Sequence, residues 1–295
     1  MKAVGPRSTF ELVKILVTGA AGLIGSHFAR RLGADHDVLA LTRKDLDITD
    51  QPAVQTRVAQ ERPSLLVNCA VIQVDEAERD PAKAAAVNVE GARFLADAAA
   101  QFSAEMIQFS TQYAFDGEII GRAPYTIRDQ PRPINFYGRT KVAAEEAVRA
   151  ACAQSYIVRT SWVYGKGKNS FLCTVHNDLG SGRRVRAIDD VWSSTTYVDD
   201  LIDRCLEILK LRRYGTYHIV NEGVCSYYDF ALDAGRLTGV RKEQLGSLIE
   251  VVHERDLQRI ALRPRYTPMR CLLSEEFGLA PMRHWRDALA HYVKS

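Results

Sequence analysis

A glycine-rich segment near the amino terminus constrains the fold of this chain more than any other feature. Residues 19–25 read Gly-Ala-Ala-Gly-Leu-Ile-Gly, after the apolar run 15–17 and before a helical pattern over residues 26–32. Glycines between a strand and a helix permit a tight turn and a close backbone approach to a phosphate, which the helix amino terminus attracts. The segment predicts a dinucleotide-binding loop, and a glycine-rich turn without a ligand is the alternative. The residues expected against the ligand are Gly19, Ala21, Gly22, Leu23, Ile24 and Gly25.

Apolar runs alternate with helix-length amphipathic stretches through the first half of the chain. Such alternation is typical of an α/β fold, with a parallel sheet covered by helices on both faces. We therefore expect a Rossmann-type, doubly wound parallel sheet. Its strands are expected at residues 15–17, 38–41, 65–67, 106–109 and 156–158, and its longer helices at residues 81–101 and 137–153.

The pattern loosens beyond about residue 165. Helices are expected at residues 169–179, 198–211, 227–237 and 284–293, and strands at residues 185–188 and 217–220. We expect an extension at residues 1–13 and a dinucleotide-binding domain at residues 14–168, with later returns near 185–220. Residues 169–295 are expected to form mainly a smaller C-terminal substrate-binding lobe over the open end of the sheet, where ligands of such folds bind.

Composition limits the kinds of partner and cofactor that this chain is expected to bind. The net charge of +3 gives no reason to expect a nucleic acid, and no apolar run approaches the roughly 20 residues that span a membrane. Six scattered cysteines without a Cys-x-x-Cys pair suggest a reduced, cytoplasmic chain, in which Cys69 and Cys205 are buried as small hydrophobic residues. The seven histidines lack metal-ligand spacing, so no metal is expected.

The residues after the second expected strand indicate which dinucleotide binds. A carboxylate there would bind the adenosine ribose and repel a 2′-phosphate, whereas this chain has Thr42, Arg43 and Lys44. A hydroxyl followed by two cations favours NADP(H). NAD(H) remains possible if Arg43 only stacks on the adenine.

Tyr137 and Lys141 are four residues apart on an expected helix, and Ser110 and Thr111 end an expected strand. Residues at this spacing share one helix face, and a neighbouring cation favours the phenolate form of a tyrosine. Such a pair suits carbonyl reduction, in which a proton reaches the oxygen as hydride reaches the carbon. A hydroxyl that only caps the strand end is the alternative for Thr111.

These parts, in this order, resemble the extended short-chain dehydrogenase/reductases, most closely the dTDP-4-dehydrorhamnose reductase family. The resemblance extends from residue 14 to the C-terminus. The blocks that carry it are residues 45–50 (DLDITD), 74–78 (VDEAE), 110–117 (STQYAFDG), 159–165 (RTSWVYG), 196–201 (TYVDDL) and 263–264 (RP).

The resemblance implies a role for each of several residues. Thr111 would hydrogen-bond the substrate carbonyl, Tyr137 would donate the proton, and Lys141 would bind the nicotinamide ribose and lower the pKa of Tyr137. Asp47 and Ile48 match positions that hold the adenine. Ala70 matches a position that lines the cofactor.

For several residues on the substrate side, the sequence leaves two interpretations open. Trp162 is either a wall against the sugar or core packing, and Asn88 either orders a proton-relay water or is a satisfied polar group. Arg263 and Arg265 either bind a nucleotide diphosphate or form salt bridges. Gln112 stands where the family commonly has an acidic residue, so the identity of the sugar depends on it.

We therefore expect an NADP(H)-dependent reductase of a nucleotide-linked, dTDP-type 4-keto-6-deoxysugar. Gln112 and Tyr113 replace the acid–base pair of the related dehydratases, which makes dehydration an unsuitable reaction. A C4 epimerase of the same superfamily is one alternative. A non-catalytic subunit, similar to the regulatory subunit of methionine adenosyltransferase, is the other. The family also suggests a homodimer.

Overall fold

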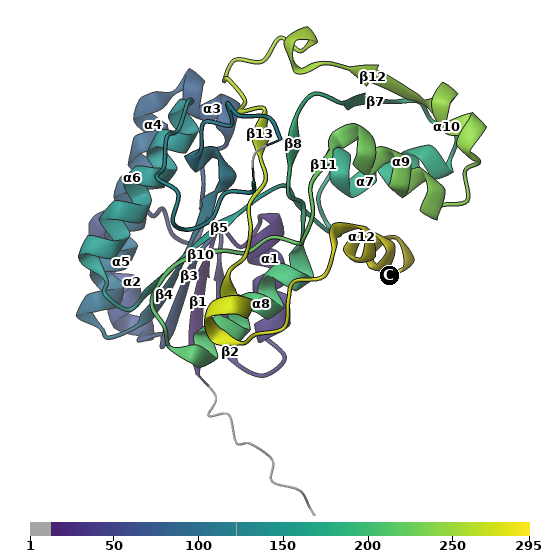
Figure 1. Cartoon of the computed structure of the whole chain (residues 1–295). Coiled ribbons are helices and arrows are strands. Elements are labelled where there is room, and N and C mark those ends of the chain that lie inside the picture. Colours follow the sequence, from purple (N-terminus) through teal and green to yellow (C-terminus); the bar gives the residue numbers. More distant parts are fainter. Residues whose placement is uncertain (1–12, 122) are drawn as a thin grey trace, which may run out of the picture.

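The computed structural model describes residues 13–121 and 123–295, so the expected N-terminal extension lies, except for Val13, outside the described residues. Figure 1 shows a large sheet flanked by helices and, above its open end, a smaller part that contains most of the second half of the chain. We call this smaller part the lobe. Among the described residues, no helix combines the length and apolar character that a membrane span requires.

Six parallel strands form the central sheet, in the order β2-β1-β3-β4-β5-β10. Because β2 lies on one side of β1 and β3 on the other, the winding direction reverses between β1 and β3, where ligands of such sheets bind. The predicted α/β, doubly wound fold is confirmed. The strands are β1 (Lys14–Thr18), β2 (Asp37–Leu41), β3 (Leu65–Asn68), β4 (Glu105–Thr111), β5 (Ser155–Thr160) and β10 (Gly215–His218).

Helices cover both faces of the sheet, as its apolar strands require. Alternate residues of a strand point to opposite faces, so Leu16 packs among α2 (Gln51–Glu61), α5 (Ala92–Gln101) and α6 (Phe136–Ala151). Its neighbour Val17 packs on the other face, among α1 (Leu23–Leu32) and α8 (Val198–Leu211).

The helical region before α5 differs from the single helix expected at residues 81–101. After the short α3 (Val74–Arg79), the chain forms α4 (Pro81–Ala85), a π-helical turn η1 (Ala86–Gly91) and then α5. The π-helical turn brings Gly91 against Ile48, where an added Cβ would lie 2.7 Å from the Ile48 side chain. Helix α2 follows the second strand and was not predicted.

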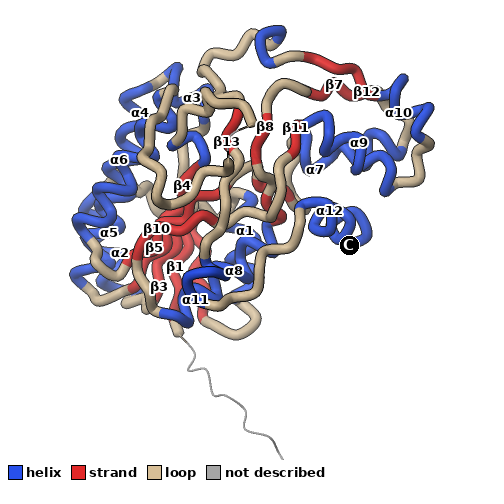
Figure 2. The backbone as a smooth tube through the Cα atoms, in the orientation of Figure 1, coloured by secondary structure: helices blue, strands red, loops and turns tan. Residues whose placement is uncertain are grey.

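The lobe is built from small sheets and helices (Figure 2). Its strand β7 (Val185–Ile188) pairs in parallel with β12 (Ile249–Val252), and β8 (Trp192–Ser193) lies between β11 (Cys225–Ser226) and β13 (Tyr266–Thr267). The other elements beyond the sheet are β6 (Val163–Tyr164), β9 (Thr196–Tyr197), α7 (Phe171–Gly180), α9 (Tyr227–Leu237), α10 (Lys242–Leu248), α12 (Trp285–Lys294) and the 3-10 turn η3 (Glu254–Asp256). Outside the lobe, the 3-10 turn η2 (Gln112–Ala114) follows β4, and α11 (Leu273–Phe277) lies beside α8 (Figure 2).

The chain passes between the sheet and the lobe more than once. It leaves the sheet after β5, forms α7, β7 and β8 in the lobe, and returns through α8 to place β10 beside β5. Strand β7, inside the expected return near residues 185–220, pairs with β12 rather than with the central sheet. The domain boundary at residue 168 stays a prediction.

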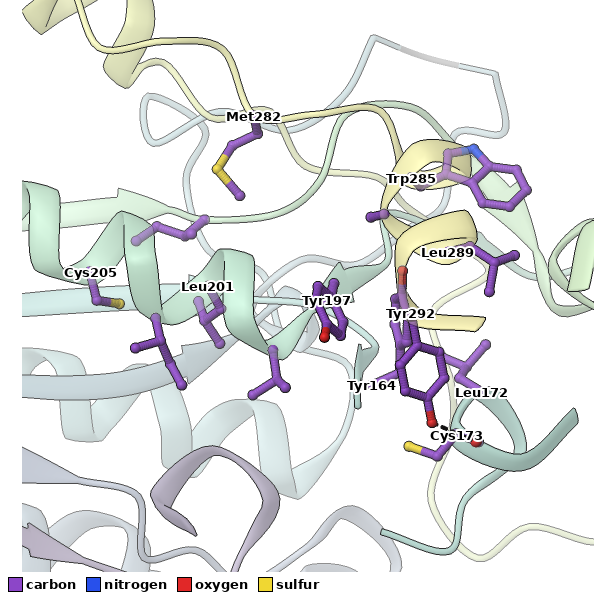
Figure 3. Close-up of a cluster of buried hydrophobic side chains, with 14 of the residues drawn as sticks. Tyr164, Leu172, Cys173, Tyr197, Leu201, Cys205, Met282, Trp285, Leu289 and Tyr292 are labelled. Atoms are coloured by element: carbon purple, nitrogen blue, oxygen red, sulfur yellow. Dashed lines mark hydrogen bonds between the residues drawn. The ribbon is translucent and has the colours of Figure 1, made fainter. Parts of the chain in front are cut away.

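An aromatic cluster joins the two parts of the molecule (Figure 3). Tyr164 and Tyr197 lie between α8 and the C-terminal helix α12, and the hydroxyl of Tyr292 donates to the carbonyl of Cys173 at 2.8 Å. All of these side chains are buried in one continuous hydrophobic core with Leu201 and Cys205 of α8. The lobe therefore packs against α8, on one face of the sheet, and is not joined to the sheet by linkers alone.

Candidate active site

A cavity of about 820 Å3 opens where the carboxyl ends of the strands meet the lobe. Its sheet side comes from the segments that follow β1, β3 and β4 and from α6, and its lobe side comes from α7, β7, β12 and α9. The predicted residues that it brings together are Ala21, Gly22, Leu23, Ile24, Gly25, Ala70, Thr111, Gln112, Tyr137, Lys141 and Trp162.

The glycine segment forms the turn that its sequence predicts. Gly19 has φ +65°, and an added Cβ would lie 2.5 Å from the backbone of Cys69 and Ala70, so only glycine fits without strain. Gly22 begins α1 with no side-chain cap, and the first turn contains no acidic residue. The amide end of α1 thus faces the cavity with no carboxylate against it, which fits a dinucleotide phosphate. Gly19 lies beneath the turn and does not line the cavity.

Asn68 at the end of β3 is a buried site residue that the sequence reasoning missed. Its amide oxygen accepts from Thr18 Oγ1 at 2.7 Å and from the Ala70 amide at 3.1 Å, and its nitrogen donates to Gln108 Oε1 at 2.7 Å. This network joins the ends of β1 and β3 to the middle of β4 and fixes Ala70 at the cavity. Cys69, expected to be buried in the core, is partly exposed and lines the cavity. Cys205 is fully buried as expected.

Thr111 ends β4 and faces the cavity. Its hydroxyl donates to Gln112 Oε1 at 3.0 Å and accepts from the Tyr113 amide at 3.2 Å. The hydroxyl therefore caps the turn η2, as the alternative interpretation held, and it also lies at the cavity, as catalysis requires. Gln112 is 4% exposed, so its amide contacts this hydroxyl in a water-poor environment.

Tyr137 and Lys141 lie one turn apart on α6 and both line the cavity. Burial raises the pKa of Tyr137, an effect that Tyr113 reinforces and the Thr111 hydroxyl opposes. Burial lowers the pKa of Lys141 to about 8, against the attraction of Glu145. The rise that burial causes is opposite to the expected lowering of the Tyr137 pKa by Lys141, and it holds the phenol in the protonated form that a proton donor needs.

Asn88 lies in the π-helical turn, behind the Tyr137–Lys141 face. Its Oδ1 accepts from the Ile72 amide at 2.8 Å, and its Nδ2 donates to the Ile72 carbonyl and to Thr140 Oγ1, each at 3.1 Å. Both N–H donors of the amide and its oxygen thus bind protein groups, as the satisfied-polar-group interpretation expects, and the amide connects the segment after β3 to α6.

The residues expected around the adenosine lie outside the main cavity, at the end of β2. Thr42 donates through its amide and hydroxyl to Asp45, and Arg43 is largely exposed and 3.4 Å from Asp47 Oδ2. The Ala20 amide donates to the Leu41 carbonyl at 3.1 Å, which holds this region beside the glycine turn. Hydrogen bonds from Thr49 hold the pKa of Asp47 below its usual range. Ile48 is buried among α2 and α5.

The Trp162 ring lies against that of Tyr227 at the lobe side of the cavity, with centroids 3.9 Å apart and the ring planes tilted by 31°. Its φ of +41° is unusual for a bulky residue, so the surrounding structure must hold the backbone there. The indole is therefore both packed and exposed to the cavity.

Arg263 and Arg265 do not reach the main cavity. They line a neighbouring pocket of about 560 Å3 that shares Leu257 and Arg259 with it. Arg263 is bound to Asp75 Oδ2 at 2.8 Å and Arg265 to Asp190 Oδ2 at 3.3 Å, so both form the salt bridges that were the alternative.

Several further residues around the cavity carry charge that the sequence reasoning did not use. Arg186 of β7 lies 3.5 Å from Glu250, and Arg259 lies 3.1 Å from Glu254. Both line the main cavity, together with Lys168. Arg186 belongs to a basic run with Arg183 and Arg184, and this run is the sequence feature that could have indicated a charged residue at the cavity. Asp189, Asp190 and His253 also lie near one another, where Asp189 Oδ1 is 2.8 Å from His253 Nδ1.

A family model described as the RmlD substrate-binding domain matches residues 13–295. The chain belongs to that family. Two relatives are similar to this chain over most of their own lengths. The dTDP-4-dehydrorhamnose reductase of Mycolicibacterium smegmatis is 39% identical over 95% of this chain and 85% of that protein. The dTDP-4-keto-6-deoxy-D-glucose reductase of Streptomyces niveus is 37% identical over 93% of this chain and 94% of that protein.

Solved structures of RmlD relatives agree with the fold. The dTDP-4-dehydrorhamnose reductase of Bacillus anthracis, determined in complex with NADP, has a TM-score of 0.88 at 30% identity and covers 97% of this chain and 100% of that chain. The Clostridium acetobutylicum reductase has a TM-score of 0.86 at 35% identity and covers 95% of this chain and 98% of that chain. The family resemblance predicted from sequence is confirmed, and the NADP of the B. anthracis structure agrees with the expected cofactor.

Proposed function

We propose that this chain is an NADP(H)-dependent reductase of a dTDP-linked 4-keto-6-deoxysugar. The observation that carries the proposal is the meeting of Thr111, Tyr137 and Lys141 at one cavity with an unobstructed glycine turn. Relatives named as dTDP-sugar reductases support the reaction class. NAD(H) would also fit this cavity, and Arg43, outside it at the end of β2, is the group that would favour the 2′-phosphate of NADP(H).

The proposed mechanism divides the work among these side chains. The nicotinamide, when bound, supplies a hydride to the C4 carbon of the sugar. Tyr137, whose phenol burial keeps protonated, gives its proton to the C4 oxygen, so that the ketone becomes an alcohol. Thr111 turns its hydroxyl from Gln112 to the same oxygen and stabilises the developing charge. Lys141 holds the nicotinamide ribose and places a positive charge beside the phenolate that remains.

The neighbouring pocket offers a place for the nucleotide half of the substrate. It shares the lining residues Leu257 and Arg259 with the main cavity and presents four arginine side chains. Arg263 and Arg265 would contact a diphosphate there while keeping their acidic partners, since a guanidinium has five donors. Trp162 would form the wall beside the sugar, and Gln112 would contact one of its hydroxyls.

Replacement of Tyr137 by Phe tests the proton donor. The variant removes one hydroxyl from the cavity, so we expect turnover to fall about 10²- to 10⁴-fold while NADPH affinity stays within about twofold. Turnover is measured by NADPH oxidation at 340 nm with a panel of dTDP-4-keto-6-deoxysugars, and affinity by NADPH fluorescence. Near-normal turnover in the variant would exclude Tyr137 as the donor.

The same assay separates the alternatives. A C4 epimerase would convert one nucleotide sugar into another without net NADPH oxidation. A non-catalytic subunit would bind NADPH but turn over no member of the panel. A homodimer remains a prediction.

A further inference from the structure

We infer that His27 is a positioning residue for the dinucleotide, because its ring holds one wall of the cavity against the helix that carries the glycine turn. This inference rests on the proposed nicotinamide cofactor. The wall segment is defined here as residues 165–170, of which Gly167, Lys168 and Ser170 line the cavity.

His27 lies in α1, two residues after Gly25, and is 7% exposed. Its Nε2 is 2.8 Å from the carbonyl of Lys166, and because a carbonyl can only accept, the ring must donate this hydrogen bond. One side chain thus ties the first turns of α1 directly to the wall segment, although 139 residues separate them in the sequence.

The other ring nitrogen connects α1 to α8. Nδ1 is 2.9 Å from Asp199 Oδ1 and 3.0 Å from a guanidinium nitrogen of Arg30. Asp199 is itself held by the hydroxyl of Tyr197 at 2.7 Å, so the carboxylate that orients the imidazole does not depend on His27 for its place. The ring is therefore fixed from both sides with its Nε2 aimed at Lys166.

The wall segment fits closely against the same two helices. A Cβ added to Gly165 would lie 2.4 Å from a methyl group of Val198 in α8 and 3.8 Å from Cε1 of His27. At the other side, Lys166 Nζ donates to the backbone oxygen of Ser295 at 2.5 Å. Residues 166–169 are exposed, and the His27 hydrogen bond to the Lys166 carbonyl is one of the contacts that hold the backbone of the wall segment.

Two variants at this position separate hydrogen bonding from packing. His27→Leu removes the donor to Lys166, whereas His27→Gln keeps an N–H near the position of Nε2. Asp203→Asn is the matched control, because Arg31 and Asp203 form an exposed ion pair of 3.3 Å between the same two helices, away from the wall segment.

The first measurement is hydrogen exchange of the wall-segment amides in the full chain without cofactor. We expect exchange to be about tenfold faster in His27→Leu, which loses one hydrogen bond, and within about twofold of wild type in His27→Gln and Asp203→Asn. The second is the NADPH dissociation constant by fluorescence, which we expect to rise about tenfold in His27→Leu only. In steady state, KM for NADPH should rise while kcat stays within about twofold.

Each contrary result has a definite meaning. Unchanged exchange in His27→Leu overturns the contact between His27 and the wall segment. Faster exchange with unchanged NADPH affinity overturns the positioning role. If His27→Leu does not fold, the same criteria apply to Asp199→Ala, which removes the oxygen that His27 Nδ1 contacts and so releases the ring from α8. Absence of NADPH binding to the wild-type chain overturns the proposed function itself, whatever the exchange rates are.

Discussion

Replacement of Lys141 by Met should make the fold more stable at neutral pH while it removes function. Lys141 is 3% exposed, and among the described residues its ammonium forms no ion pair. Burial lowers its pKa from the ordinary 10.5 to about 8, so the charged form disfavours the folded state. At 1.36 kcal/mol for each pH unit, this difference corresponds to about 3 kcal/mol at pH 7.

The sign of the pH dependence follows from proton binding. Between pH 8 and 10.5 the unfolded chain holds the Lys141 proton more tightly than the folded chain does, so the free energy of unfolding rises with pH. The penalty is fully present below pH 8 and disappears as pH approaches 10.5. A methionine has no such penalty, so the stability gap between the variant and wild type should close over that window.

The assay is urea unfolding of both proteins without cofactor, at steps from pH 7 to pH 10. We expect Lys141→Met to be more stable by about 3 kcal/mol at pH 7 and by less than about 1 kcal/mol at pH 10. Other groups that titrate at high pH affect both proteins and cancel in the difference. Lys242→Met, at an exposed position on α10, is the control and should show no closing gap. A gap that does not change with pH would refute the reasoning.

Two further predictions concern the dinucleotide. Arg43→Ala should raise the dissociation constant of NADPH about tenfold and leave that of NADH unchanged, because only the former offers a 2′-phosphate to the exposed guanidinium; equal effects on both, by fluorescence titration, would show that Arg43 only stacks on the adenine. Gly19→Ala places a Cβ 2.5 Å from the backbone of Cys69 and Ala70, so NADPH binding should be lost and the free energy of unfolding should fall by about 1–3 kcal/mol. Retained NADPH affinity in this variant, by the same titration, would contradict the account of the glycine turn.

Short sequence patterns predicted those parts of the fold that depend only on residues close together in the chain. The glycine turn depends on backbone freedom at residues that are neighbours in the sequence, and the apolar runs of β1, β3, β4 and β5 are buried on both faces. The Tyr137–Lys141 pair needed only the period of a helix. These features are therefore readable from short windows.

Helix α2 was missed because its apolar pattern is weak. Only Val54 and Val58 of its eleven residues are buried, which gives a single apolar pair one turn apart. Its start was nevertheless visible, since Asp50 accepts a hydrogen bond from the Ala53 amide and Pro52 follows at the second helical position. Capping residues would have found this helix where periodicity did not.

The arginines of the site could not be assigned because their partners are distant in the sequence. Arg263 pairs with Asp75, 188 residues away, and Arg265 pairs with Asp190, 75 residues away. The pairing of β7 with β12, which brings Arg186 to the cavity, is equally non-local. No spacing rule connects such residues, so the charge on the substrate side becomes visible only in three dimensions.

The late return of the chain to the sheet has a consequence for synthesis on the ribosome. Strand β5, buried along its whole length, gains its outer neighbour β10 only when residues 215–218 have been made, more than 50 residues later. Until then the nascent chain exposes an apolar strand edge, a typical starting point for aggregation. Chaperone binding during translation should therefore concentrate on chains that end between β5 and β10.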